Sequence, residues 1–260
     1  MIPLFTKLKT LFMLFVVLAS VAYGQQSQDL QDLQQRHREA RADAAAYLHI
    51  RSITVKGTSA IGSEKQNFEL TARESGELRY AVETPAGLVI QVFDGEDGWR
   101  WVSGKPELGA QKLTDRQVRF FLLTSGFYTP FEDPDDFAFT PVYMGIEVNE
   151  EGEPEHHVQL VSSRYDDVMD VWIDAYTFLE NRRQYRPEQG AAPLVMEFLE
   201  YERVDGVFVP MTVKTSFNGK PLGTTSIDYV GRNSGMLSFY FNKPPSYAEV
   251  QVEAGKIAAQ

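Results

Sequence analysis

The sequence predicts a mainly β fold (α+β) in which one large, strongly curved antiparallel sheet carries helices on its concave side. From Ile50 onward, short runs of alternating apolar and polar residues are separated by turn residues about every ten positions. Two segments with helical spacing stand at residues 28–48 and 114–125. Such a length is common in one all-β unit, so we expect a single domain at residues 25–245.

Residues 1–24 have the pattern of a cleaved secretory signal peptide. Lys7 and Lys9 give a basic start, and an uncharged apolar run follows from Leu11 to Ala22. Small residues then precede a cut ahead of Gln25. The run is shorter than the roughly 20 residues of a stable membrane span. We therefore expect an exported, periplasmic protein; the alternative is an uncleaved N-terminal anchor.

The composition excludes several classes of protein and site. The sequence has no cysteine, which excludes disulfides, a thiol nucleophile, thiolate metal ligands and a lipid-modified cysteine at the mature N-terminus. The formal net charge is −11, which argues against nucleic acid and against an anionic membrane surface as partners.

The first predicted helix spans residues 28–48. Residues that can face a core recur at spacings of three and four, with charges between them. These residues are Leu30, Leu33, His37, Ala40, Ala44 and Tyr47.

The alternating runs after this helix predict an antiparallel meander. In the run at residues 68–73, Phe68, Leu70 and Ala72 face one way and the polar residues between them face the other. Turns between the first five runs are expected at residues 57–62, 75–76, 85–87 and 94–98. The strands resume from 142 to 233, and the Ala- and Glu-rich residues 246–260 are expected to be a flexible C-terminal tail.

The stretch FDGEDGWRWV, residues 93–102, could be an acidic metal loop or a tight turn. A calcium loop needs oxygen ligands spread over about a dozen residues and a terminal bidentate Glu, which this stretch lacks. Its Asp-Gly pairs tolerate positive φ and have strands on both sides, so we predict a hairpin turn and no metal. Trp99 and Trp101 then share one face of the sheet.

A second helix is predicted at residues 114–125. Thr114 and Gln117 have the spacing of a capping box, and Gly126 is a natural C-terminal stop. The helix and the loop that follows it to residue 141 are rich in aromatic residues. A loop of this length in a compact domain is usually packed over something or functional.

No motif predicts catalysis. The sequence lacks a Gly-x-Ser-x-Gly elbow, a phosphate loop and a His-Glu-x-x-His pair. His156 and His157 are adjacent in a predicted strand, so they point to opposite faces and make a poor ligand pair. We expect no catalytic residue, no metal and no cofactor, and therefore no enzyme.

The aromatic segment instead suggests a hydrophobic cavity with a lid. Core packing explains any single aromatic residue, but together they exceed what a helix packed on one side needs. The residues expected to line the cavity and lid are Trp99, Trp101, Phe120, Phe121, Phe127 and Phe131.

At five stretches the chain resembles the periplasmic outer-membrane lipoprotein-sorting proteins, the LolA/LolB-like superfamily. The stretches are SITVKGTSAIG, NFELTARESGELRYAV, VFDGEDGWRWV, WIDAYTFLENRRQY and EYERVDGVFVPMTVKT. The likeness covers most of residues 45–244. It implies an unclosed β-barrel that wraps a helix and binds acyl chains or a lipoprotein's lipid anchor without chemistry or cofactor. The family's lid-holding arginine falls by motif position on Arg73, which here is followed by Glu74 and not by the usual proline.

The sequence therefore predicts a carrier that holds lipid, acyl chains or a lipoprotein lipid anchor, and whose possible partners are an envelope transporter or receptor protein. The alternative is a non-catalytic binding or sensing module of the same fold, which recognises lipoprotein or an envelope component. A hydrolase on an unfamiliar scaffold is a third option. A carrier and a sensor differ in whether the ligand is handed on.

Overall fold

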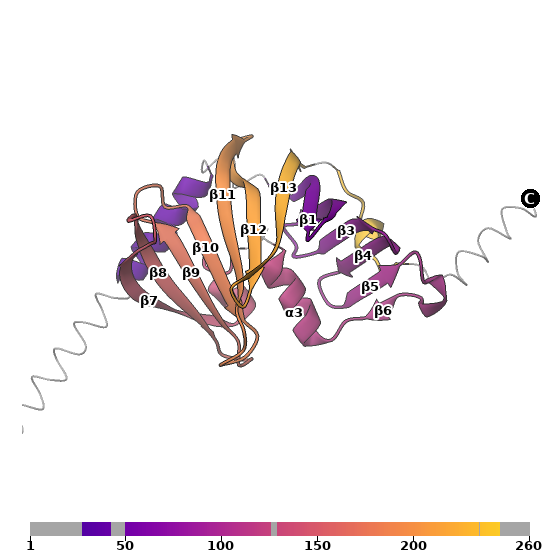
Figure 1. Cartoon of the computed structure of the whole chain (residues 1–260), viewed down its shortest axis with the longest axis horizontal. Helices are drawn as coiled ribbons and strands as arrows, with labels where there is room; N and C mark the ends of the chain where they lie inside the picture. Colours follow the sequence, from indigo (N-terminus) through magenta and orange to yellow (C-terminus); the bar gives the residue numbers. More distant parts are fainter. Residues whose placement is uncertain (1–27, 43–49, 126–128, 234, 245–260) are drawn as a thin grey trace, which may run out of the picture.

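The computed structural model describes residues 28–42, 50–125, 129–233 and 235–244 (Figure 1). The predicted signal peptide, residues 1–24, and the predicted tail, residues 246–260, lie outside the described residues. Among the described residues, no helix is long and apolar enough to cross a membrane.

One antiparallel sheet of 13 strands forms the body of the protein. Its first six strands are β1 (Ser52–Ile61), β2 (Glu64–Arg73), β3 (Leu78–Thr84), β4 (Gly87–Phe93), β5 (Gly98–Val102) and β6 (Gln111–Lys112). The other seven are β7 (Phe139–Val148), β8 (Pro154–Ser162), β9 (Val168–Asp174), β10 (Glu180–Arg186), β11 (Leu194–Val204), β12 (Val207–Phe217) and β13 (Lys220–Arg232).

The strand order places the two ends of the meander side by side. It runs β6-β5-β4-β3-β2-β1-β13-β12-β11-β10-β9-β8-β7, so β1 pairs with β13 and the sheet edges are β6 and β7. These two edge strands are consecutive in the chain, and the segment that joins them carries α3 (Asp115–Thr124). The sheet is therefore an unclosed barrel with α3 between its halves, which confirms the predicted fold class (Figure 1).

The two helices of the described residues lie on one face of the sheet, here called the inner face. Leu70 of β2 and Leu160 of β8 lie on this face, and the register of the intervening strands places them on the same side. Alternate residues point to the other, outer face. Short 3-10 turns are formed at Pro106–Leu108, Pro134–Phe137 and Ser238–Phe241, the last named η3.

α3 begins where the sequence predicts. The Thr114 side chain accepts a hydrogen bond from the Gln117 backbone N–H, and the Gln117 side chain accepts one from the Thr114 N–H, which completes the capping box. The first described helix covers residues 28–41 and is called helix 28–41 below. Its predicted continuation beyond residue 42 falls outside the described residues.

The Asp94–Asp97 turn is confirmed as a hairpin turn between β4 and β5. The Asp94 carboxylate accepts hydrogen bonds from the backbone N–H groups of Glu96 and Asp97, at 2.9 and 2.7 Å. Asp97 forms an ion pair with Lys112 on the neighbouring strand β6 at 2.6 Å. The acidic side chains thus order the turn and its edge.

The turn expected at residues 57–62 is shorter than predicted. β1 continues through Gly57 to Ile61, and the pairing with β13 shifts by one residue between Lys56 and Gly57. A Cβ on Gly57 would lie 2.0 Å from the Ser226 carbonyl oxygen, so glycine is needed here for close strand approach. Gly57 therefore marks a bulge within a strand and not a turn.

Candidate functional site

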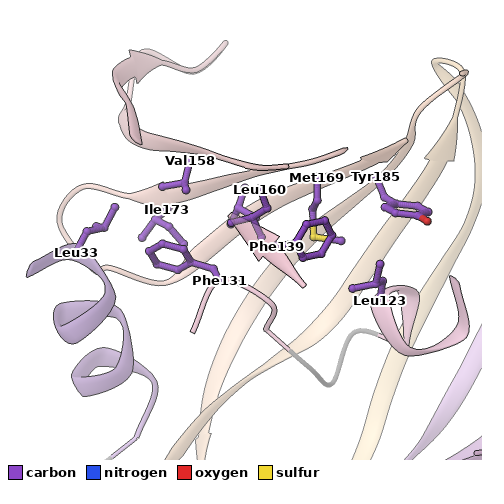
Figure 2. Close-up of a cluster of buried hydrophobic side chains, with 10 residues drawn as sticks. Leu33, Leu123, Phe131, Phe139, Val158, Leu160, Met169, Ile173 and Tyr185 are labelled. Carbon is purple, nitrogen blue, oxygen red and sulfur yellow. The ribbon is translucent and has the colours of Figure 1, made fainter. Parts of the chain in front are cut away.

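Two separate apolar clusters cover the inner face. The first joins strands β7–β10 to helix 28–41, to the segment after α3 and to α3 itself; its buried residues are Leu33, Leu123, Phe131, Phe139, Val158, Leu160, Met169, Val171, Ile173 and Tyr185 (Figure 2). The second joins strands β1–β3 to α3; its buried residues are Ile53, Val55, Phe68, Leu70, Ala72, Leu78, Val82 and Phe121. The sheet thus has two apolar halves with α3 between them.

α3 contributes a residue to each cluster. Leu123 packs in the first cluster, where Figure 2 shows it beside Tyr185, whereas Phe121 is buried in the second and Leu122 packs against the second. A helix with apolar residues on several sides is covered on several sides. The residues from Val118 to Leu123 are apolar apart from Arg119, and the central position of α3 explains this composition.

Two buried arginines fasten α3 to the β8–β10 half. Arg119 of α3 donates Nε and Nη2 hydrogen bonds to the Asp167 carboxylate, at 2.5 and 3.2 Å, and an Nη1 hydrogen bond to the Phe137 carbonyl at 2.6 Å. Arg183 of β10 donates to Glu180 at 2.7 and 2.8 Å and to the Leu123 carbonyl at 3.2 Å. The hydrogen bond from Arg183 to Leu123 satisfies a backbone carbonyl at the C-terminal end of α3. Breaking either pair would leave a buried charge.

The contact between α3 and the β1–β5 half is of another kind. It is made by Phe121 and Leu122 against the second cluster, and by Val118 against Gly98 of β5. A Cβ on Gly98 would lie 2.3 Å from Val118 Cγ2, so the absence of a side chain at Gly98 admits α3. These contacts are apolar, and apolar contacts have no directional requirement.

Between the clusters lies a strip of half-buried residues, here called the central strip. It consists of Met211 and Val213 of β12 and Thr225 and Ile227 of β13, which share the inner face with Phe198 by register. Residues inside the two clusters, such as Leu78 and Leu160, are fully buried. The central strip is therefore less covered than the buried residues of the two clusters on either side of it.

The predicted cavity residues of α3 and its loop occupy different environments. Phe121 and Phe131 are buried in the second and first clusters. Phe120 has 45 % of its surface exposed, with its ring 6.0 Å from that of Tyr185. Phe127 lies outside the described residues. Contact of these residues with a ligand stays a prediction.

Trp99, Trp101 and Arg73 lie on the outer face. Trp99 pairs with Val92, and that register places both Trp residues opposite the second cluster. The Lys243 ammonium lies 4.9 Å from the Trp99 ring. The structure thus places the two predicted cavity Trp residues away from α3, with the C-terminal residues.

The C-terminal segment, residues 235–244, covers this outer face. Arg73 donates to the Met236 carbonyl at 2.6 Å, and its guanidinium stacks 5.2 Å from the Phe241 ring. Arg79 lies 4.2 Å from the Tyr240 ring. Arg73 therefore holds the C-terminal segment in this structure; the lid role that the resemblance implied for it stays a prediction.

His156 and His157 point to opposite faces, as predicted. His156 lies on the inner side, 2.8 Å from the Tyr143 hydroxyl. His157 lies on the outer face between two carboxylates, with Nδ1 2.8 Å from Glu147 and Nε2 3.1 Å from Asp170. Burial alone would lower the pKa of His157, but these hydrogen bonds outweigh it and raise the pKa. These contacts favour the imidazolium form, in which both nitrogens are donors.

A buried histidine joins helix 28–41 to the segment after α3. The His37 side chain is fully buried, with Nδ1 2.7 Å from the Phe178 carbonyl oxygen and Nε2 3.4 Å from a Glu132 carboxylate oxygen. Arg41 forms an ion pair with the same carboxylate at 2.9 Å. Burial lowers the pKa of His37, so the ring is neutral.

The residues that fasten α3 were not identified from sequence. Arg119 is the polar exception in the apolar run from Val118 to Leu123, and Arg183 stands in a polar run, NRRQY, without a motif. The signal that could have found them is the charge itself, because a charged residue in the middle of an apolar helical face needs a buried partner.

Comparisons with solved structures give three close fits along most of the chain. A DUF1329 family protein from Desulfovibrio piger has a TM-score of 0.59 at 13 % identity, covering 84 % of this chain and 97 % of that one. A putative outer membrane lipoprotein-sorting protein domain from Vibrio parahaemolyticus has a TM-score of 0.57 at 12 % identity, covering 82 % and 96 %. A LolA superfamily protein from Nitrosomonas europaea has a TM-score of 0.55 at 12 % identity, covering 82 % and 97 %.

No family model and no curated protein matches the sequence. At these identities the structural likeness speaks for the fold alone. The likeness extends over more than four-fifths of the chain, and the chain itself has one unclosed 13-stranded sheet. The protein has a LolA-like fold.

Proposed function

We propose that this protein is an exported, non-catalytic carrier of an apolar ligand, which it holds on the inner face of its sheet beside α3. The ligand class is a lipid, an acyl chain or the lipid anchor of a lipoprotein. The observation that carries the proposal is the division of the apolar interior by α3, which packs Leu123 into one cluster and Phe121 into the other beside a half-buried central strip. Each buried acyl CH₂ group would contribute about 0.8 kcal/mol.

The lipoprotein anchor draws further support from the named relatives of this fold. The Vibrio parahaemolyticus structure is described as a putative outer membrane lipoprotein-sorting protein domain. A lipoprotein anchor is a set of acyl chains, and the central strip presents the apolar surface such chains require. The corresponding partners are an envelope transporter that loads the carrier or a receptor that unloads it.

A second candidate is a sensing module that binds the same ligand without handing it on. The buried Arg119–Asp167 pair and the hydrogen bond from Arg183 to the Leu123 carbonyl favour it, because both resist full release of α3. Transfer of a labelled lipid from the protein to acceptor vesicles separates the two candidates: a carrier transfers it and a sensor retains it.

The decisive test is native mass spectrometry of the protein purified from its own envelope, followed by titration with a fluorescent fatty acid. The carrier should retain a lipid-sized mass and bind the probe. Val213→Asn in the central strip should weaken probe binding by about five- to a hundredfold, since a lost apolar contact costs roughly 1–3 kcal/mol.

The matched control is Lys214→Asn, one residue further along β12, where the side chain is exposed on the outer face. It should leave probe binding unchanged. A wild-type protein that carries no lipid and binds no acyl probe would overturn the proposal, and equal loss in both variants would place the ligand elsewhere.

A further inference from the structure

A small cavity opens beside α3 at the end of β10. It has a volume of about 40 Å³ and is lined by Arg116, Arg119, Phe120, Tyr165, Asp167, Tyr185 and Pro187. A water molecule needs about 10–15 Å³ of such volume, so the cavity has room for about three atoms of that size. It can therefore take the oxygen atoms of a small polar group, and an acyl chain must lie outside it.

Of the charged side chains that line the cavity, Arg116 is the one whose charge is available to a ligand. Asp167 is neutralised by the bidentate hydrogen bonds of Arg119 and accepts a further hydrogen bond from the Tyr185 hydroxyl at 3.2 Å. Arg116 has an exposed side chain and forms no ion pair or hydrogen bond with the part of the chain that the structure describes. The cavity wall thus has a net positive charge within a protein whose formal charge is −11.

The apolar part of the wall lies next to this cation. Phe120 follows Arg116 by four residues, which puts both side chains on one face of α3. Phe120 is the largest exposed apolar side chain of α3, and its ring lies 6.0 Å from the Tyr185 ring. A guanidinium and an exposed aromatic ring on one helix face match a ligand with an anionic end and an apolar body.

We propose that this cavity binds the anionic head group, a carboxylate or a phosphate, of the carried lipid, with Arg116 as its ion-pair partner and Phe120 against the first part of the acyl chain. The proposal rests on the proposed carrier function and adds to it the chemistry of the ligand's polar end. Arg119 acts only as a positioning residue, since Asp167 and the Phe137 carbonyl occupy its donors.

The test compares a fluorescent fatty acid with its methyl ester, which has the same chain and no charge, at pH 7.5. Wild type should bind the acid about three- to tenfold more tightly than the ester, the range of a partly exposed charge-assisted pair. Arg116→Gln should remove that preference and leave ester binding unchanged. Arg51→Gln, an exposed arginine beside the β2–β3 turn, should keep it.

Two competition experiments show whether the site recognises a lipid head group or a free anion. A lysophospholipid with a phosphate head group should displace the fatty acid, and inorganic phosphate or acetate at the same concentration should not, because neither has a chain for Phe120. Displacement by free phosphate, equal binding of acid and ester, or a preference that survives Arg116→Gln would each overturn the head-group site. If neither the acid nor the ester binds wild type, the carrier function itself fails.

Discussion

The two halves of the sheet hold α3 by different forces. On the β8–β10 side, Arg119 and Arg183 form buried ion pairs and bond to backbone carbonyl groups. On the β1–β5 side, the contacts are Phe121 and Leu122 with the second cluster and Val118 with Gly98. One side is directional and charged, and the other is apolar.

The difference indicates where a ligand would enter. An acyl chain can replace an apolar contact with another apolar contact at little cost, because the effect is non-directional. It cannot replace a buried ion pair, and an unpaired buried charge costs several kcal/mol. We therefore expect α3 to separate from the β1–β5 half and to stay attached to the β8–β10 half.

The outer face differs between the halves as well. The C-terminal segment covers β1–β5 through Arg73, Arg79 and the buried Phe241. This cover is independent of α3, so the β1–β5 half would keep a stabilising layer when its inner contacts with α3 open.

The largest effect is expected from Arg183→Met, which leaves Glu180 buried without its partner. The free energy of unfolding should fall by about 3–5 kcal/mol, measured by urea denaturation. The double variant Arg183→Met/Glu180→Gln should recover a large part of that loss, because no buried charge is left. A single variant as stable as wild type would contradict the role of Arg183 and Glu180 as a stabilising buried ion pair.

A smaller effect is expected on the outer face from Phe241→Ala. Phe241 is only 1 % exposed, and its truncation should lower the free energy of unfolding by about 2–4 kcal/mol. Phe239, in the same turn η3, is 67 % exposed, so Phe239→Ala should change it by less than about 0.5 kcal/mol. If both variants behave alike in thermal or urea melts, η3 does not stabilise the β1–β5 half.

The smallest effects are expected from two histidines, His37 of helix 28–41 and His157 of β8, and they have opposite signs. The lowered pKa of His37 means that its contribution is present above its ordinary pKa and is lost as the pH falls. The raised pKa of His157 means that its contribution is present below its ordinary pKa and is lost as the pH rises through the raised value. Both statements follow from which protonation state the fold favours.

Urea melts of wild type, His37→Gln and His157→Gln at pH 5.5 and 8.5 measure these contributions. The loss caused by His157→Gln should be larger at pH 5.5, and the loss caused by His37→Gln should be larger at pH 8.5. The same pH trend in both variants would show that the two rings are not held in opposite charge states.

Sequence patterns predicted the sheet and its helices because these depend on local spacing. Period-two alternation determines which residues share a face, and Thr114 with Gln117 specifies the start of α3. The adjacent histidines were assigned correctly to opposite faces for the same reason.

Alternation alone could not tell which face is inner. Trp99 and Trp101 share a face, as predicted, but the C-terminal segment lies over that side of β1–β5, so apolar residues there belong to an outer layer. The role of Arg183 depends on a contact with Leu123 across 60 positions of the chain, which no local pattern encodes.

The separation of α3 from the β1–β5 half is tested most directly by a reversible lock. A Cβ on Gly98 would lie 2.3 Å from Val118 Cγ2, so cysteines placed at these two positions by Gly98→Cys/Val118→Cys are close enough to form a disulfide. The chain has no other cysteine that could compete for either of them. Reduced and oxidised forms share both substitutions, so their difference isolates the lock. We predict that the oxidised protein binds a fluorescent fatty acid at least about tenfold more weakly than the reduced protein; equal binding by the two forms would contradict the proposed entry between α3 and β5.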